Sequence, residues 1–123
     1  MKRLELKGII PATVLPMDRH FRIDEFSLKR YIAWLTGFGK LGGVAVNADT
    51  GEGPHLSQEE RLRVVKIYRR ELKGRMPIIS GLSARCTEEA VKCGKELIRA
   101  GADALLVFPI GAFMGQPLDW KVP

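Results

Sequence analysis

The sequence has few of the features that mark secreted, metal-binding or membrane proteins. Its only cysteines are Cys86 and Cys93, too few for a disulfide framework and not spaced as a metal-binding pair. The two histidines, His20 and His55, lie far apart with no partner at ligand spacing. We therefore expect two reduced thiols and no metal site.

Long apolar runs are also missing. No stretch approaches the roughly 20 apolar residues of a transmembrane helix, and Glu5 and Lys7 interrupt the segment that would have to be the apolar core of a signal peptide. The hydrophobic fraction of 46% and the charged fraction of 28% are ordinary for a globular protein. At 123 residues we expect a single cytoplasmic domain, residues 1–123, that does not associate with a membrane.

The net charge of +6 raises the question of a nucleic-acid partner, and much of it lies in residues 61–75, RLRVVKIYRRELKGR. Leu62, Val65, Tyr68 and Leu72 form an apolar stripe at helical spacing in this segment. No aromatic residues are interleaved on its basic side, as a nucleic-acid surface would favour. The pattern favours the solvated face of an amphipathic helix, and nucleic-acid binding is the weaker alternative.

Four apolar segments alternate with three helical patterns. Several segments are apolar throughout, as parallel strands covered on both faces require, and helices then form the crossovers between them. The order β-α-β-α-β-α-β predicts an α/β fold, either an open doubly wound sheet or about the first four βα units of a (β/α)8 TIM barrel. The predicted strands are residues 8–14, 43–47, 77–82 and 104–108.

The starts of the three helices have recognisable signals. Asp24 is a predicted N-cap of the first helix. The apolar positions of this helix at helical spacing are Leu28, Tyr31, Ile32 and Leu35. Ser57 and Glu60 have the spacing of a capping box at the start of the second. The third is predicted to begin at Thr87 and to end at Gly101. Its stripe at helical spacing is Val91, Gly94, Leu97 and Ile98.

Residues 47–61, NADTGEGPHLSQEER, join a predicted strand to a predicted helix and contain a dense group of polar residues. Asp49, Thr50 and Gly51 are common in ordinary turns, which is one interpretation. The other is a loop that binds a small anionic substrate, because hydroxyl and backbone N–H groups at the end of a strand suit a carboxylate.

Residues 42–61 resemble the signature of the dihydrodipicolinate synthase / N-acetylneuraminate lyase family. Its members have Gly-Thr-Thr-Gly-Glu or Gly-Ser-Thr-Gly-Glu after the second strand, then Leu-Ser and an acidic helix ending in Glu-Arg. The segments GIIPATVLPMD, GRMPIISGLS and AGADALLVFP are similar to the family's first, third and fourth strands. The resemblance covers nearly the whole chain but only about the first half of a family member. The signature residues in register are Thr50, Gly51, Glu52, Leu56, Ser57, Glu60 and Arg61.

This resemblance implies a (β/α)8 barrel, usually a homotetramer, with class I aldolase chemistry on pyruvate or a related 2-oxo acid. A lysine forms a Schiff base with the keto acid, which acidifies the adjacent carbon, and no cofactor is implied. The resemblance makes Thr50 the residue that binds the substrate carboxylate, with Ala48, Asp49 and Gly51 beside it. Glu52 is expected to brace the loop rather than to contact substrate.

Two departures from the family pattern affect the expected substrate. Asp49 replaces the first Thr of the signature and Ala48 replaces the preceding Gly. A carboxylate cannot donate a proton at neutral pH unless its pKa is raised, and it would repel a substrate carboxylate. The stretch Pro109–Phe113 also lacks the tyrosine that follows the fourth strand in synthases. We therefore expect a different 2-oxo acid or a sugar acid rather than dihydrodipicolinate synthesis.

The Schiff-base lysine and the catalytic tyrosine of the family come from the fifth and sixth strands, and the sequence ends before both. No lysine here follows a predicted strand, where a barrel assembles its site. We expect no catalytic residue in this chain, which would be an inactive N-terminal half of a lyase. The alternative is a non-catalytic half-barrel that pairs with itself or with a missing half, because a lone piece leaves two unpaired sheet edges.

Overall fold

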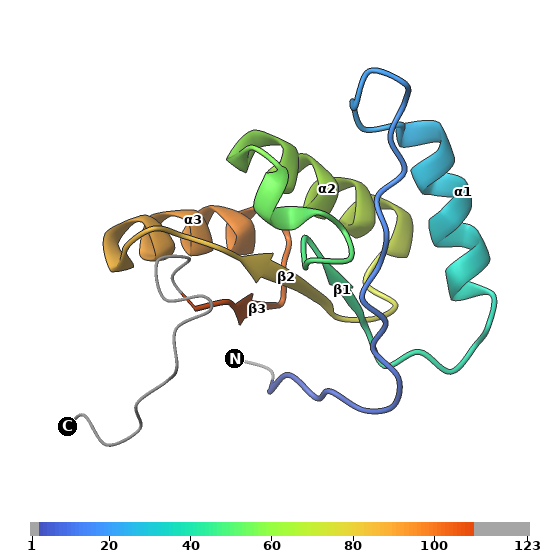
Figure 1. The fold of residues 1–123 in the computed structure, drawn as a ribbon. Helices are drawn as coiled ribbons and strands as arrows, with labels where there is room; N and C mark the ends of the chain where they lie inside the picture. The colour runs from blue at the N-terminus through green and yellow to red at the C-terminus, as the bar shows by residue number, and fades with distance from the viewer. Residues whose placement is uncertain (1–2, 110–123) are drawn as a thin grey trace.

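The computed structural model of the chain describes residues 3–109, in which three helices cover one face of a small parallel sheet (Figure 1). The strands lie in the order β1-β2-β3, and Val46 is in register with Ser80 across the first pair. Parallel neighbours joined by helices confirm the predicted α/β class. The strands are β1, Val44–Val46, β2, Ile78–Leu82, and β3, Ala104–Val107.

The expectation of a regular strand over residues 8–14 is wrong. This segment runs beside β1 and makes only isolated parallel bridges, such as Ala12 with Ala45. Ala45 N donates to Pro11 O, and Thr13 N donates to Ala45 O, both at 2.9 Å. Pro11 has no N–H to continue the ladder, so the sheet of the described residues has three strands rather than four.

The predicted helix starts are confirmed. The Asp24 side chain accepts a hydrogen bond from Ser27 N at 3.0 Å at the start of α1. Ser57 and Glu60 form the capping box of α2, with reciprocal bonds of 3.1 and 2.8 Å. Within residues 3–109, no helix has both the length and the apolar character needed to cross a membrane. The helices are α1, Glu25–Thr36, α2, Gln58–Leu72, and α3, Thr87–Ala100.

The core lies between the helices and the sheet. The apolar stripes of α1 and α2 that the sequence predicts point into it, except that Tyr31 and Leu62 lie at its margin. In α3 only part of the stripe is buried, because Val91 and Ile98 remain exposed. The fully buried side chains that join the layers include Leu28, Ile32, Val44, Val46, Val65, Tyr68, Leu72, Ile78 and Leu97.

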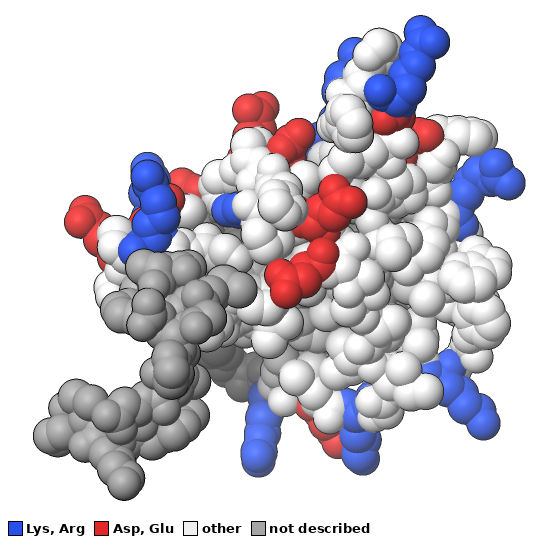
Figure 2. Space-filling view, viewed as in Figure 1, with Lys and Arg blue, Asp and Glu red and all other residues white. Residues whose placement is uncertain are grey.

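The basic second helix makes ion pairs with neighbouring elements. Arg63 and Arg70 contact Glu25 of α1 at 3.1 and 2.6 Å, and Arg69 contacts Asp103 at 2.6 Å. Hydrogen bonds from Arg70 and then Arg63 lower the pKa of Glu25 to about 2. On the face in Figure 2, basic side chains lie apart from one another, mostly around the margin, and acidic ones are spread over the upper part and the centre. This arrangement supports the interpretation of a solvated helix face.

Candidate functional site

The candidate site is the loop from Asn47 to Leu56, which joins the carboxyl end of β1 to the start of α2. A short 3-10 helix, η1, Gly53–His55, forms its second half. The predicted strand-to-helix junction around Thr50 is therefore confirmed. In parallel α/β sheets this end of the strands is where ligand sites form.

Backbone hydrogen bonds give the loop a defined shape. Ala48 O accepts from both Gly51 N and Gly53 N, at 3.1 and 3.0 Å, and Glu52 N donates to Asp49 O at 3.0 Å. These nested turns place Thr50 at the tip of the loop. The conformation is thus set largely by the backbone, which leaves the side chains of the tip available.

The loop separates its residues into buried and exposed ones. Ala48 and Gly51 are buried, while Asp49 and Thr50 are exposed beside each other. A Cβ at position 51 would lie 2.8 Å from Thr13 O, which explains why this position is glycine. Of the four residues predicted to bind substrate, the structure therefore presents Asp49 and Thr50 to solvent and uses Ala48 and Gly51 to shape the backbone.

The hydrogen bonds that hold the loop come from residues other than the Glu52 carboxylate. Glu52 has a left-handed backbone, with φ of 58°, and an exposed side chain; its backbone O accepts from His55 N at 2.9 Å. Arg61 Nε donates to Gly53 O at 2.8 Å and so ties η1 to α2. A bracing role for the Glu52 side chain stays a prediction, whereas Arg61 makes a direct contact.

Three buried polar residues near the loop were not singled out from the sequence. They are Thr13, Asn47 and Ser80, each at most 3% exposed. Asn47 Nδ2 donates to Ser80 Oγ at 3.0 Å, and Thr13 Oγ1 donates to Ala45 O at 3.2 Å. The available signal was one polar residue inside or just after each of the first three apolar segments, since buried polar side chains need partners.

The described residues place no lysine amine at the strand ends. The segments that directly follow β1, β2 and β3 contain no lysine within residues 3–109. The same residues bring no three His, Cys, Asp or Glu side chains together as a metal site. The predicted departure after the fourth strand falls mainly on residues 110–123, which lie outside the described residues.

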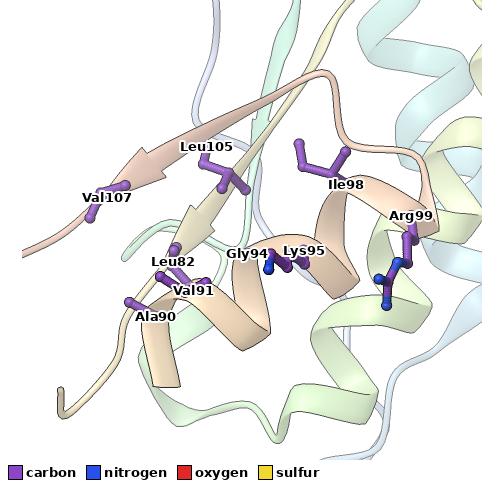
Figure 3. A pocket seen from close by; sticks show the side chains of 9 residues that line it. All are labelled: Leu82, Ala90, Val91, Gly94, Lys95, Ile98, Arg99, Leu105 and Val107. Carbon is purple, nitrogen blue, oxygen red and sulfur yellow. The ribbon is translucent and has the colours of Figure 1, made fainter. Parts of the chain in front are cut away.

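An apolar groove of about 530 Å³ lies away from the loop, between α3 and the strands. Its side chains come from α3 and from β2 and β3 (Figure 3). Exposed Val91 and Ile98 on the helix and Val107 on β3 contribute to it. Lys95 and Arg99 also line the groove, but its surface is mostly apolar and suits apolar packing.

Comparisons with known proteins agree with this geometry. The model of the dihydrodipicolinate synthetase family matches residues 5–110. The 4-hydroxy-tetrahydrodipicolinate synthase of Bartonella quintana is 37% identical over 102 residues, which are 83% of this chain and 34% of that protein. The corresponding synthase of Acidiphilium cryptum is 41% identical over 100 residues, or 81% of this chain and 34% of the relative.

Solved structures show the same relationship. Dihydrodipicolinate synthase from Agrobacterium tumefaciens is 33% identical, with a TM-score of 0.76, over 83% of this chain and 34% of its own. The Aquifex aeolicus enzyme is 30% identical, with a TM-score of 0.74, over 81% of this chain and 33% of its own. The chain thus spans about a third of the length of these relatives, and its parallel sheet and helices are consistent with part of a barrel. On these grounds the chain belongs to the dihydrodipicolinate synthetase family.

Proposed function

We propose that the Ala48–Glu52 loop binds the carboxylate of pyruvate or a related 2-oxo acid, as part of a class I aldolase or lyase. The observation that carries this proposal is the exposed residue Thr50 at the tip of a backbone-ordered loop at the carboxyl end of β1. A hydroxyl held at such a strand end can donate to a carboxylate oxygen. The family relationship supplies the reaction class.

No lysine among residues 3–109 is placed to form the Schiff base of the reaction. The relatives that match are about three times as long as the matched region, and the described lysines lie on helices or ahead of strands. An amine must reach the keto carbon to form the imine. We therefore propose that residues 3–109 contribute the acid-binding loop and that the Schiff-base lysine lies outside these residues.

The exposed Asp49 beside Thr50 argues for a substrate other than that of the named relatives. Two carboxylates held close together repel each other, so pyruvate is expected to bind beside Asp49 more weakly than a 2-oxo acid whose tail also contacts Asp49. A carboxylate also accepts hydrogen bonds well from hydroxyl groups. We propose a 2-oxo acid with a hydroxylated tail, as in a sugar acid, whose hydroxyl groups donate to Asp49.

A titration of the isotopically labelled chain with pyruvate tests the carboxylate site. The amide resonances of Thr50 and Gly51 are expected to shift with pyruvate and not with pyruvamide, which lacks the carboxylate. Thr50→Ala is expected to weaken binding about tenfold, the loss of one hydrogen bond to a charged group, while Thr50→Ser retains it. Equal shifts in Thr50→Ala and the unaltered chain would refute the assignment of Thr50.

Borohydride trapping tests the missing amine. The chain is incubated with pyruvate and sodium borohydride, and its mass is measured. We expect no reduced adduct, because no described lysine follows a strand. A stoichiometric adduct would show that the short chain forms the imine itself.

The exposed apolar residues of α3 and β3, here called the open edge, favour a second candidate function. This is a non-catalytic half-barrel that associates with another copy. Val91, Ile98, Leu106 and Val107 are all exposed there, and an unpaired parallel strand edge invites pairing. Sedimentation velocity of the chain distinguishes the two candidates. A stable dimer that does not bind pyruvate supports the non-catalytic half-barrel. A monomer that binds pyruvate supports the acid-binding function.

A further inference from the structure

Asn47 occupies a special position in the backbone. It is the first residue after β1 and has a left-handed conformation, with φ of 56°. Among residues with a side chain, asparagine adopts this conformation at comparatively low cost. The chain therefore leaves the strand at Asn47 in a conformation that most other residues with a side chain adopt only at a higher energetic cost.

The Asn47 side chain joins three segments. Its Nδ2 donates to Arg61 O in α2 at 3.2 Å and to Ser80 Oγ in β2 at 3.0 Å. Ser80 is fully buried, and its hydroxyl donates onward to Gly81 O at 3.2 Å. One amide group thus links the end of β1 to its neighbouring strand and to the first turn of the following helix.

The carbonyl of Asn47 is enclosed by two glycines. A Cβ on Gly53 would lie 1.8 Å from Asn47 O, and a Cβ on Gly81 would lie 2.1 Å from it. Neither position can accept any side chain without moving the backbone. The backbone of the loop at Gly53 and the backbone of β2 at Gly81 therefore both pack closely against the Asn47 carbonyl.

The burial of the Asn47 Oδ1 atom lowers stability, so stability does not explain why asparagine is present here. Within residues 3–109, Asn47 Oδ1 is buried without a hydrogen-bond partner, which is energetically unfavourable. A smaller apolar residue would avoid that cost but would lose both bonds from Nδ2. The arrangement favours a role in geometry.

We propose that Asn47 is a positioning residue that sets the orientation of the substrate loop and thereby the affinity for the substrate carboxylate. It acts through Ala48, the next residue, whose carbonyl organises both turns by accepting from Gly51 N and Gly53 N. Thr50 lies inside these turns. The role in affinity rests on the proposed function, whereas the role in loop geometry does not.

Amide hydrogen exchange tests the positioning role on the chain itself. Asn47→Gly keeps the left-handed backbone accessible but removes the side-chain links. We expect exchange at Gly51 and Gly53 to become about tenfold faster, with amides of α3 unchanged, because local opening is separate from global unfolding. Thr36→Ala, which removes a side-chain bond to Ile32 O in α1, is the matched control and leaves the loop amides unchanged.

A uniform rise in exchange across loop and helices would overturn the proposal, since it would show that Asn47 contributes only to general stability. Unchanged exchange at Gly51 and Gly53 would overturn it as well. If Asn47→Gly does not fold, Ser80→Ala removes one of the two partners and is expected to give the same local pattern with a smaller rise. An unchanged pattern in Ser80→Ala then counts against the proposal.

Pyruvate titration of the same variants separates this inference from the proposed function. We expect Asn47→Gly to weaken pyruvate binding about tenfold, comparable to losing one charge-assisted bond. Equal affinity in Asn47→Gly and the unaltered chain would overturn the role in affinity while the proposed function stands. Absence of pyruvate binding in the unaltered chain would refute the proposed function, and the exchange ratios would still decide the positioning role.

Discussion

The strand ends around Asn47 and the open edge formed by α3 and β3 are built in opposite ways. At the strand ends, side-chain and backbone hydrogen bonds converge from β1, β2 and α2 on a few buried polar atoms. At the open edge, exposed Val91, Ile98 and Val107 line an apolar groove. In the first region most buried polar atoms have partners within residues 3–109, with Asn47 Oδ1 as an exception, whereas the second presents a surface that apolar groups would cover.

The difference shows which contacts this chain completes by itself. Directional hydrogen bonds organise the loop, and they are local to two neighbouring strands and one helix. Apolar burial needs area rather than direction, and the edge has no further layer among the described residues to supply it. Loop geometry can therefore be studied in this chain, while the environment of the edge depends on what packs there.

The two faces of α3 give the largest expected contrast. Leu97 is fully buried, whereas its neighbour Ile98 is 46% exposed on the groove side. Leu97→Ala is expected to lower the free energy of unfolding by about 2–5 kcal/mol, and Ile98→Ala by less than about 1 kcal/mol. Urea unfolding followed by circular dichroism measures both, and similar losses would mean that the edge is already covered in solution.

Gly53→Ala tests whether the strand-end region is as tightly packed as its geometry requires. The new Cβ would lie 1.8 Å from Asn47 O, so we expect a loss of about 3 kcal/mol in unfolding free energy. The control is Gly37→Ala, where the backbone is right-handed and the nearest atom is 3.2 Å away. If Gly53→Ala is no more destabilised than Gly37→Ala, the loop is looser than described.

The ion pairs of Glu25 are partly exposed to solvent, in contrast to the buried contacts tested above. Their loss is expected to change stability the least of the three predictions. Arg70 and Arg63 lower the pKa of Glu25 to about 2 from an ordinary value of 4.5. The stabilisation is therefore present above pH 4.5 and is lost as pH falls from about 4.5 towards 2. Between about pH 5 and pH 2, the midpoint temperature of thermal unfolding is expected to depend less on pH in Glu25→Gln than in the unaltered chain. Identical pH profiles in the two proteins would contradict the ion pairing of Glu25.

Sequence patterns predicted much of the fold because they reflect local rules. Helical spacing, the Asp24 cap and the capping box at Ser57 act within a few residues, and all appear as expected. The first strand did not, because Pro11 interrupts a ladder that apolar composition alone predicts. The exposed half of the α3 stripe was also not apparent, since periodicity does not say whether a partner layer is present.

For the candidate site, the sequence located the loop and the tip residue Thr50 but not the residues that hold the loop. Glu52 was expected to brace it, whereas the contacts described come from Arg61 and Asn47. These bonds reach across 8 and 14 positions, and the bond to Ser80 across 33. No local pattern relates such distant residues.

The amino-acid order by itself determined the α/β class, the helix starts and the loop at the end of β1, because capping and hydrophobic periodicity operate over one or two turns. Only the tertiary structure decided that Asn47, Gly53 and Gly81 meet at one carbonyl and that one side of α3 stays open. Those outcomes depend on how separate strands and helices pack, and close packing leaves room for a side chain only where no other backbone passes.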